Sequence, residues 1–239
     1  MDAQSNPPPF DLKRCRDLTI ERPVVEVLED DVTAAFRTLA RSTPELADKG
    51  DFQALARLLG FDDALSLRRE VRAQLERQAQ DMTARLLRQR VLQPLLESFQ
   101  PAADPAAVRL EVASLVREAQ DLGQHFPPGK VEQVVVPVAE MRVRSAALVK
   151  SLANALGLEP SEAQILRALE RHAESYRDPD AVLAHLKRST AAAKPVVDEL
   201  VENLVVEGVL RHAQVVDKPT SLDDLALEIH RLAAEHGGG

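Results

Sequence analysis

The side chains that could bind a metal gather in one short stretch of the chain. His172 and Glu174 are followed closely by Asp178 and Asp180, and imidazole and carboxylate groups are common ligands of zinc. A zinc site also needs its ligands to converge on one point with defined geometry. This run of polar residues does not supply that geometry by itself. The sequence therefore predicts no metal site and no cofactor.

The chain contains residue types used in nucleophilic catalysis and in phosphate binding, but not the sequence motifs of such sites. Ser, His and Asp occur in no recognisable nucleophile motif, and the nine glycines are too scattered to form a phosphate-binding loop. Cys15 lies beside Lys13, Arg14 and Arg16, and such a basic setting can activate a thiol. An incidental cysteine is the simpler interpretation. We therefore expect no catalytic residue in this chain.

Composition narrows the class of protein further. A hydrophobic fraction of 45% with 28% charged residues is typical of a globular protein in water. With no Trp, one Tyr and six Phe, the chain has little material for an aromatic-lined pocket of the kind that holds small ligands. This disfavours a conventional small-molecule enzyme.

Charge and targeting features indicate where the protein acts. The net charge is −8, and no basic run alternates with aromatic residues, so a nucleic-acid partner is not expected. The single cysteine cannot form an internal disulfide, and we find no pattern typical of a signal peptide or of a membrane span. We expect a cytoplasmic protein with no membrane partner.

Hydrophobic periodicity predicts an all-α fold. A very long helix is expected over residues 65–99, with Pro94 close to its end. At a rise of about 1.5 Å per residue, such a helix is longer than a small globule is wide, so we expect a projecting strut. Before it, a β-branched segment interrupted by Pro23 predicts a short edge strand or linker.

The helices after the strut carry clear end signals. Asp104 and Pro105 predict one helix start, and Ser161 with Gln164 forms a capping box at another. Gly157 is expected to end the helix before that box in a left-handed conformation. Pro195 is expected to start the clearest amphipathic helix, and Gly208 on its apolar stripe indicates the close approach of another helix.

The order of several local strings resembles the trigger factor family of bacterial nascent-chain chaperones. The resemblance covers residues 18–228. It is carried by Glu-Arg-Pro-Val-Val-Glu-Val at residues 21–27, Leu-Gly-Phe-Asp at 59–62, Leu-Arg-Arg-Glu-Val-Arg at 67–72, Tyr-Arg-Asp-Pro-Asp-Ala-Val at 176–182 and Ala-Gln-Val-Val-Asp-Lys at 213–218. It implies an elongated multi-helix body with a strut helix and two protruding helical arms, plus the short N-terminal strand.

Two departures from the family pattern change the expected function. The family's ribosome-docking Gly-Phe-Arg-x-Gly-Lys loop is absent, because Gly60-Phe61 continues into Asp62 and Asp63. Residues 41–51 are too few to hold the family's prolyl isomerase domain, which is expected there. We therefore expect neither ribosome contact nor isomerase activity, and predict that this chain is not an enzyme.

What remains resembles the body and arms of the chaperone, which implies ATP-independent binding of unfolded or nascent polypeptides. In the family, the stripe around a Tyr-x-Asp-Pro turn contacts clients, and Tyr176 and Val182 match it. His172 and His185 stand where apolar residues are usual, which weakens that patch or makes it pH-sensitive. The expected client-binding residues are Tyr176, Val182, His172, His185, Phe126, Leu122, Phe99 and Met141.

Alternatives remain open at the level of sequence. Each apolar stripe is helix–helix core by default, and only apolar surface in excess of that core would bind clients. A helical dimerisation or interaction scaffold without general client binding, including a homodimer, is the alternative function. We expect a flexible leader over residues 1–17, a strand-plus-helix linker over 18–50 and the helical body and arms over 51–239.

Overall fold

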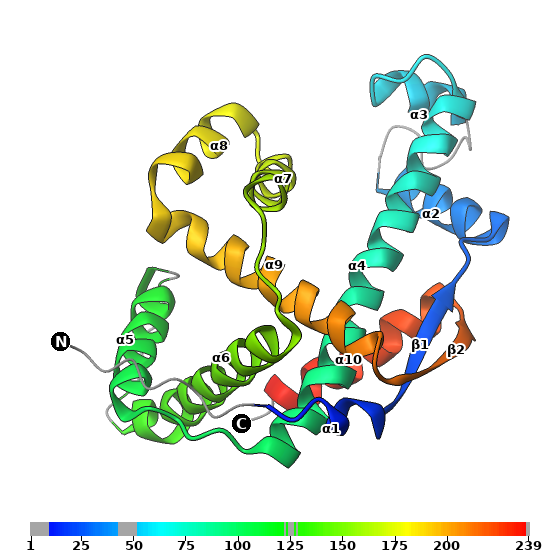
Figure 1. Cartoon of the computed structure of the whole chain (residues 1–239). Helices are drawn as coiled ribbons and strands as arrows, with labels where there is room; N and C mark the ends of the chain where they lie inside the picture. The colour runs from blue at the N-terminus through cyan, green and yellow to red at the C-terminus, as the bar shows by residue number, and fades with distance from the viewer. Residues whose placement is uncertain (1–9, 43–51, 122, 124–126, 128, 238–239) are drawn as a thin grey trace. The chain divides into compact units, whose positions relative to one another are not determined.

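The computed structural model describes residues 10–42, 52–121, 123, 127 and 129–237. Its chain forms two compact units, each described below by itself. The large unit contains residues 1–20 and 88–215, and the small unit contains residues 21–87 and 216–239. Figure 1 shows that both are built mainly from helices.

A pair of parallel strands belongs to an otherwise helical fold. Strand β1 (Thr19–Val25) pairs with β2 (Gln214–Thr220). Arg22 of β1 donates two hydrogen bonds to the Asp217 carboxylate at 2.7 and 3.0 Å, and Lys218 pairs with Glu21 at 3.1 Å. The N-terminal strand was expected from the sequence, but its partner β2 was not.

The small unit packs short helices around the first part of a long one. It contains α2 (Glu29–Arg41), α3 (Phe52–Leu58), the start of α4 (Ala64–Phe99) and α10 (Leu222–Gly237). Its core is apolar throughout and consists of Val27, Val32, Phe36, Leu55, Ala56 and Leu67. Helix α3 supplies two of these residues although its short length gave no periodic signal in the sequence.

The long helix predicted over residues 65–99 is confirmed. Helix α4 has 36 residues, and Pro94 lies inside it, near its C-terminal end. The all-α fold class is confirmed with it.

The large unit groups its helices into two sets. Helix α5 (Pro105–Asp121) contacts α6 (Val136–Leu156), which is preceded by a π-helical turn, η1 (Val131–Val135). Helices α7 (Glu162–Ala173), α8 (Pro179–Arg188) and α9 (Thr190–Leu210) contact one another, and α9 also contacts α6. Figure 1 shows the same two sets.

Most of the helix ends lie where local sequence placed them. The Asp104 carboxylate accepts a hydrogen bond from the Ala106 N–H at 3.0 Å at the start of α5. The capping box of Ser161 and Gln164 opens α7, and Gly157 ends α6 with a left-handed φ of 62°. These signals act within one helical turn, so they do not depend on the rest of the fold.

The predicted start of α9 was wrong by about one and a half turns. The helix begins at Thr190 because the Ser189 side chain accepts a hydrogen bond from the Ala192 N–H at 3.2 Å. Pro195 therefore lies inside the helix, and its side chain is exposed. A serine cap before the proline was the stronger start signal.

The segment expected to be a flexible leader is partly packed. Helix α1 (Lys13–Arg16) holds Cys15 fully buried, and the Phe10 ring lies 5.2 Å from the Phe99 ring. Burial raises the pKa of the Cys15 thiol, and nearby Asp11 raises it further. Burial and a raised pKa both lower the reactivity of a thiol, which favours the interpretation of Cys15 as an incidental residue.

Candidate functional site

Two of the expected client-binding residues, His172 and Tyr176, meet at the turn between α7 and α8. Tyr176 keeps 49% of its surface exposed, and its hydroxyl lies 3.3 Å from Nε2 of His172. The two rings are 5.4 Å apart, centre to centre. The turn itself is fixed by Asp178, whose carboxylate accepts a hydrogen bond from the Ala181 N–H at 3.1 Å. The result is a small exposed patch with one aromatic face and two polar atoms.

The other two expected residues of this turn separate on α8. Val182 is half-buried and packs against a small core made by Leu169, Leu186, Ala193 and Val196. His185 is exposed next to the buried Leu186. Val182 thus supports the α7–α8–α9 set from inside, while His172, Tyr176 and His185 offer surface.

Met141 lies in a groove of the large unit. Its side chain is 53% exposed, and the groove has a volume of about 570 Å³. The end of α4 and the residues after it form one wall, and the first turns of α6 form the other. The lining residues are Leu96, Glu97, Gln100, Pro101, Ala102, Pro137, Glu140, Met141 and Arg144. The apolar members could take an apolar side chain of a ligand, and the charged members border them.

The remaining expected residues contribute less to an open surface. Phe99 is half-buried, and the Phe10 ring packs on it. Leu122 and Phe126 lie outside the described residues. Phe99 therefore belongs partly to the packing between the N-terminal segment and the end of α4.

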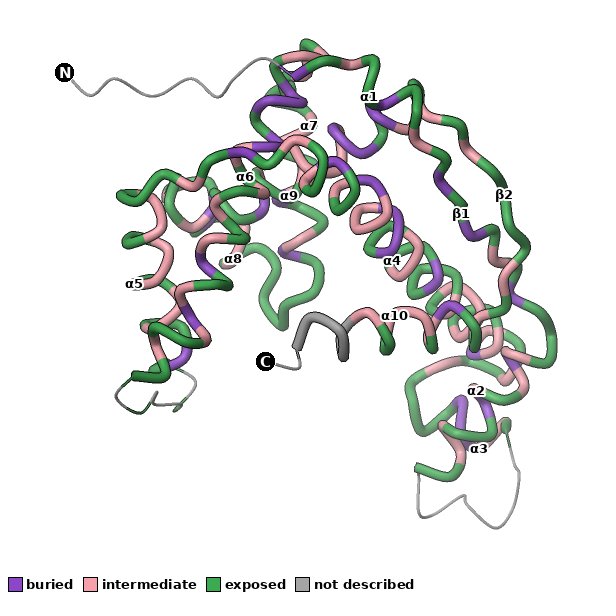
Figure 2. The backbone as a smooth tube through the Cα atoms, turned by 90° about the horizontal axis from the view of Figure 1, so that it is seen from below, coloured by how far each residue is buried: buried purple, intermediate pink, exposed green. Residues whose placement is uncertain are grey.

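Helix α5 leaves most of its apolar stripe incompletely covered. Of its residues, only Ala119 is buried, whereas Val108, Val112, Leu115 and Val116 are half-buried. Figure 2 shows this helix almost entirely in the colours of intermediate and exposed positions. Two packed helices can cover only one side of each other, so apolar surface remains at their edges.

Leu110 is a strongly exposed apolar residue that sequence reasoning missed. It is 75% exposed on α5, and Val138 on α6 is 41% exposed. Leu110 lies roughly opposite Val108 on the helical wheel, away from the stripe. Its position off the stripe of Val108, Val112 and Leu115 was the signal that would have identified it.

Polar contacts hold these helices in place. Arg142 of α6 donates to the Glu111 carboxylate of α5 at 3.0 Å. Arg88 of α4 donates to Glu199 at 3.1 Å and to Asn203 at 2.9 Å, both on α9. These bonds fix each helix pair in one register.

The pKa of one carboxyl group in the α4–α9 contact, that of Glu202, is shifted. Oε2 of Glu202 lies 3.5 Å from Nε of Arg88, and that Nε is buried without a hydrogen-bond partner. Burial raises the pKa of Glu202, Arg88 opposes the rise, and Glu199 and Asp198 add to it. Desolvation of Glu202 therefore outweighs its attraction to Arg88.

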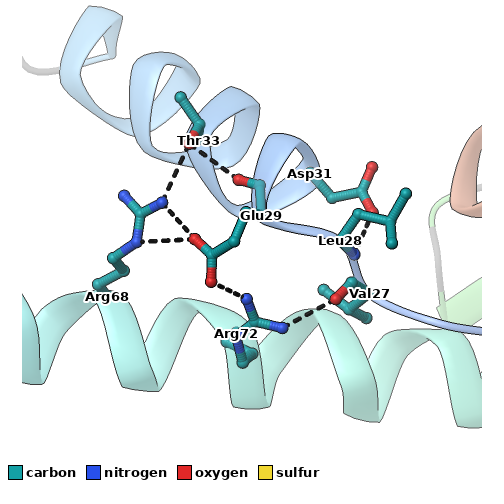
Figure 3. Close-up of polar contacts among 7 residues, drawn as sticks. All are labelled: Val27, Leu28, Glu29, Asp31, Thr33, Arg68 and Arg72. Carbon is teal, nitrogen blue, oxygen red and sulfur yellow. Dashed lines mark hydrogen bonds and ion pairs between the residues drawn. The ribbon is translucent and has the colours of Figure 1, made fainter.

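In the small unit, an exposed ion-pair cluster clamps α2 to α4. Figure 3 shows the Glu29 carboxylate between Arg68 and Arg72, both of which donate to it. Arg68 also donates to the Thr33 hydroxyl at 3.1 Å, and Arg72 to the Val27 carbonyl at 2.8 Å. The hydrogen bond from Arg68 is the main cause of the lowered pKa of Glu29. This cluster positions α2 against α4.

The small unit also has a groove, of about 370 Å³, between β1 and α4. Pro23, Val25 and Val27 line it on the side of the strand.

Across the part of the chain that the structure describes, no three His, Cys, Asp or Glu side chains come together as a metal site. Within the same residues, no helix is both long and apolar enough to cross a membrane.

Comparisons with known proteins give the family. The model described as "Bacterial trigger factor protein (TF) C-terminus" matches residues 65–211, which is more than half of the chain. Trigger factor of Chromobacterium violaceum is 28% identical over 204 residues, covering 81% of this chain and 46% of the relative. Trigger factor of Nitrosomonas eutropha is 28% identical over 207 residues, covering 84% and 47%.

A third relative is also a trigger factor, and this chain again covers only part of its length. Trigger factor of Burkholderia vietnamiensis is 30% identical over 179 residues, covering 72% of this chain and 40% of the relative. The chain thus spans less than half the length of these curated relatives. The family model, which matches more than half of the chain, and these relatives place the chain in the trigger factor family, in the part that corresponds to its C-terminus.

Proposed function

We propose that this chain is an ATP-independent chaperone module that holds unfolded or nascent polypeptides on exposed apolar helical surface. The observation that carries the proposal is the incomplete burial of α5, with Leu110 75% exposed and Met141 of the neighbouring α6 53% exposed. An unfolded chain presents apolar segments that gain free energy when they leave water. Adaptable Leu, Val and Met side chains can pack against many such segments.

The α7–α8 turn supplies a second contact in this proposal. Tyr176 offers an aromatic face and a hydroxyl on an exposed turn, and such amphipathic rings are common in binding surfaces. His172 beside it places Nε2 3.3 Å from the Tyr176 hydroxyl and adds a polar atom to this patch. We propose that this turn contacts clients together with the α5–α6 surface.

The proposal also covers location and partners. It assigns the chain to the cytoplasm, with unfolded polypeptides as partners and without ribosome contact. Fractionation of cells that produce the protein, followed by sedimentation with ribosomes, tests both points. Recovery of the chain with the membrane fraction or with ribosomes would contradict them.

The holding activity is tested by light scattering. A chemically denatured model protein is diluted into buffer without nucleotide, with this chain added at equimolar to several-fold amounts. We expect the chain to delay aggregation in proportion to its concentration. No delay at any ratio would refute the proposed function.

A matched pair of variants assigns the activity to α5. Leu110→Ser removes an exposed leucine from α5, and Leu227→Ser removes a leucine that is 69% exposed on α10 of the small unit. Both changes lie on helix surfaces and leave the cores intact. We expect Leu110→Ser to weaken the delay and Leu227→Ser to leave it unchanged. Equal effects of the two variants would mean that the client-binding site does not lie on α5.

A further inference from the structure

The turn that precedes α6 has a sequence that favours a strand and a structure that is helical. Residues 131–137 read Val-Glu-Gln-Val-Val-Val-Pro. Valine loses side-chain freedom in a helix and is enriched in strands. The segment nevertheless forms the π-helical turn η1 and the first residues of α6. Such a conflict between local preference and fold marks a site of low stability or of function.

Pro137 explains why this turn is π-helical. The Val136 N–H donates to the Val131 carbonyl, a bond one residue longer than the α-helical one. Pro137 has no N–H, and in an α-helix its ring would collide with the carbonyl of Gln133. A wider turn before Pro137 relieves that collision. Single π-helical turns are rare in proteins, and those that do occur are often found at functional sites.

Little packing holds the segment in this form. Over residues 131–147, only Val135 and Ala139 are buried, whereas the buried face of α6 extends from Leu148 to Ala153. Segments with few buried apolar contacts open at a lower free energy than the core. Residues 131–136 therefore meet the conditions for local opening.

We propose that residues 131–136 form a conformational switch that opens from the π-helical turn into an extended strand, whose backbone pairs with an extended segment of an unfolded polypeptide. This inference rests on the proposed function and adds how a client is recognised. Backbone hydrogen bonds are available in every sequence. Pairing through them gives a holding chaperone a contact that does not depend on the side chains of its client.

Hydrogen exchange tests the opening. We expect the Val136 amide, whose N–H donates to the Val131 carbonyl, to exchange faster than the amides of residues 148–153. Pro137→Ala restores an N–H and removes the ring, so it favours a regular helix and slows exchange at Val136 by about tenfold. Pro195→Ala makes the same change inside α9 and serves as the control, with exchange at Val136 unchanged. Exchange at Val136 as slow as at residues 148–153, or no effect of Pro137→Ala, would overturn the switch.

A pair of peptides tests the pairing. One is an unfolded apolar peptide, and the other has the same sequence with alternate backbone nitrogens methylated, which removes donors without removing side chains. We expect the methylated peptide to bind the unmodified chain about fivefold more weakly. With Pro137→Ala, the two peptides should bind with nearly the same affinity.

The outcomes separate this inference from the proposed function. Equal binding of the two peptides to the unmodified chain, together with a normal delay of aggregation, overturns backbone pairing alone. A chain that binds neither peptide and delays no aggregation overturns both. The exchange measurement needs no client, so it judges the opening of residues 131–136 independently.

Discussion

At the scale of single residues, Glu202 has the clearest consequence for stability. Its pKa is raised in the folded chain, mainly by burial, so the folded state binds the proton more tightly than the unfolded state. The stabilising effect is complete below the ordinary glutamate pKa and is lost as the pH rises through the folded pKa. Above the folded pKa, the ionised Glu202 thus favours unfolding.

We therefore expect Glu202→Gln to change the pH dependence of stability. The variant should gain stability relative to the unmodified chain at pH 7, and the gain should shrink as the pH falls through the raised folded pKa of Glu202 toward the ordinary glutamate pKa. Denaturant unfolding between pH 4 and pH 8 measures the difference. A constant difference across this range would show that Glu202 does not titrate as its burial requires.

The sequence predicted that another helix approaches Gly208 closely, and the structure confirms it. A Cβ at this position would lie 2.8 Å from Cδ1 of Leu156 and 3.1 Å from Cδ1 of Leu158. We expect Gly208→Val to lower the free energy of unfolding by about 2–3 kcal/mol, because a larger side chain overpacks the site. Gly208→Ala should cost less, since higher helix propensity returns about 1 kcal/mol. Equal stability of the valine variant would mean that the leucines move aside freely.

At the scale of elements, α9 tolerates a proline in its interior. Pro195 lies five residues after the first helical residue, Thr190, so its missing N–H removes a bond to the Ala191 carbonyl. Pro195 is exposed, and replacing it removes no core contact. We expect Pro195→Ala to raise the free energy of unfolding by about 1–3 kcal/mol, as measured by chemical denaturation. An unchanged or lower value would indicate that the proline helps to shape the helix.

The ends of elements also show how far sequence reasoning reaches. The caps at Asp104 and at Ser161 were predicted correctly because each bond joins residues within one turn. The start of α9 was misplaced because two start signals, Ser189 and Pro195, compete within six residues. Helix α3 has too few residues for a periodic pattern, so only its packing in the core reveals it.

At the scale of the whole molecule, the chain should hold polypeptides without isomerising them. Residues 41–51, where the family's prolyl isomerase domain was expected, are too few to hold that domain. We expect the refolding rate of a protein limited by proline isomerisation to be unchanged when this chain is added. A true prolyl isomerase serves as the positive control. Acceleration of the slow phase would contradict this expectation.

The sequence by itself determined the helical class, the long α4 and most caps, because these depend on periodicity and on bonds within a turn. Only the tertiary structure decided which apolar stripes are covered. It paired β1 with β2 from the far end of the chain, buried Cys15, placed Phe10 against Phe99 and left α5 half-covered. Burial depends on partners that are distant in sequence, and local patterns carry no information about them.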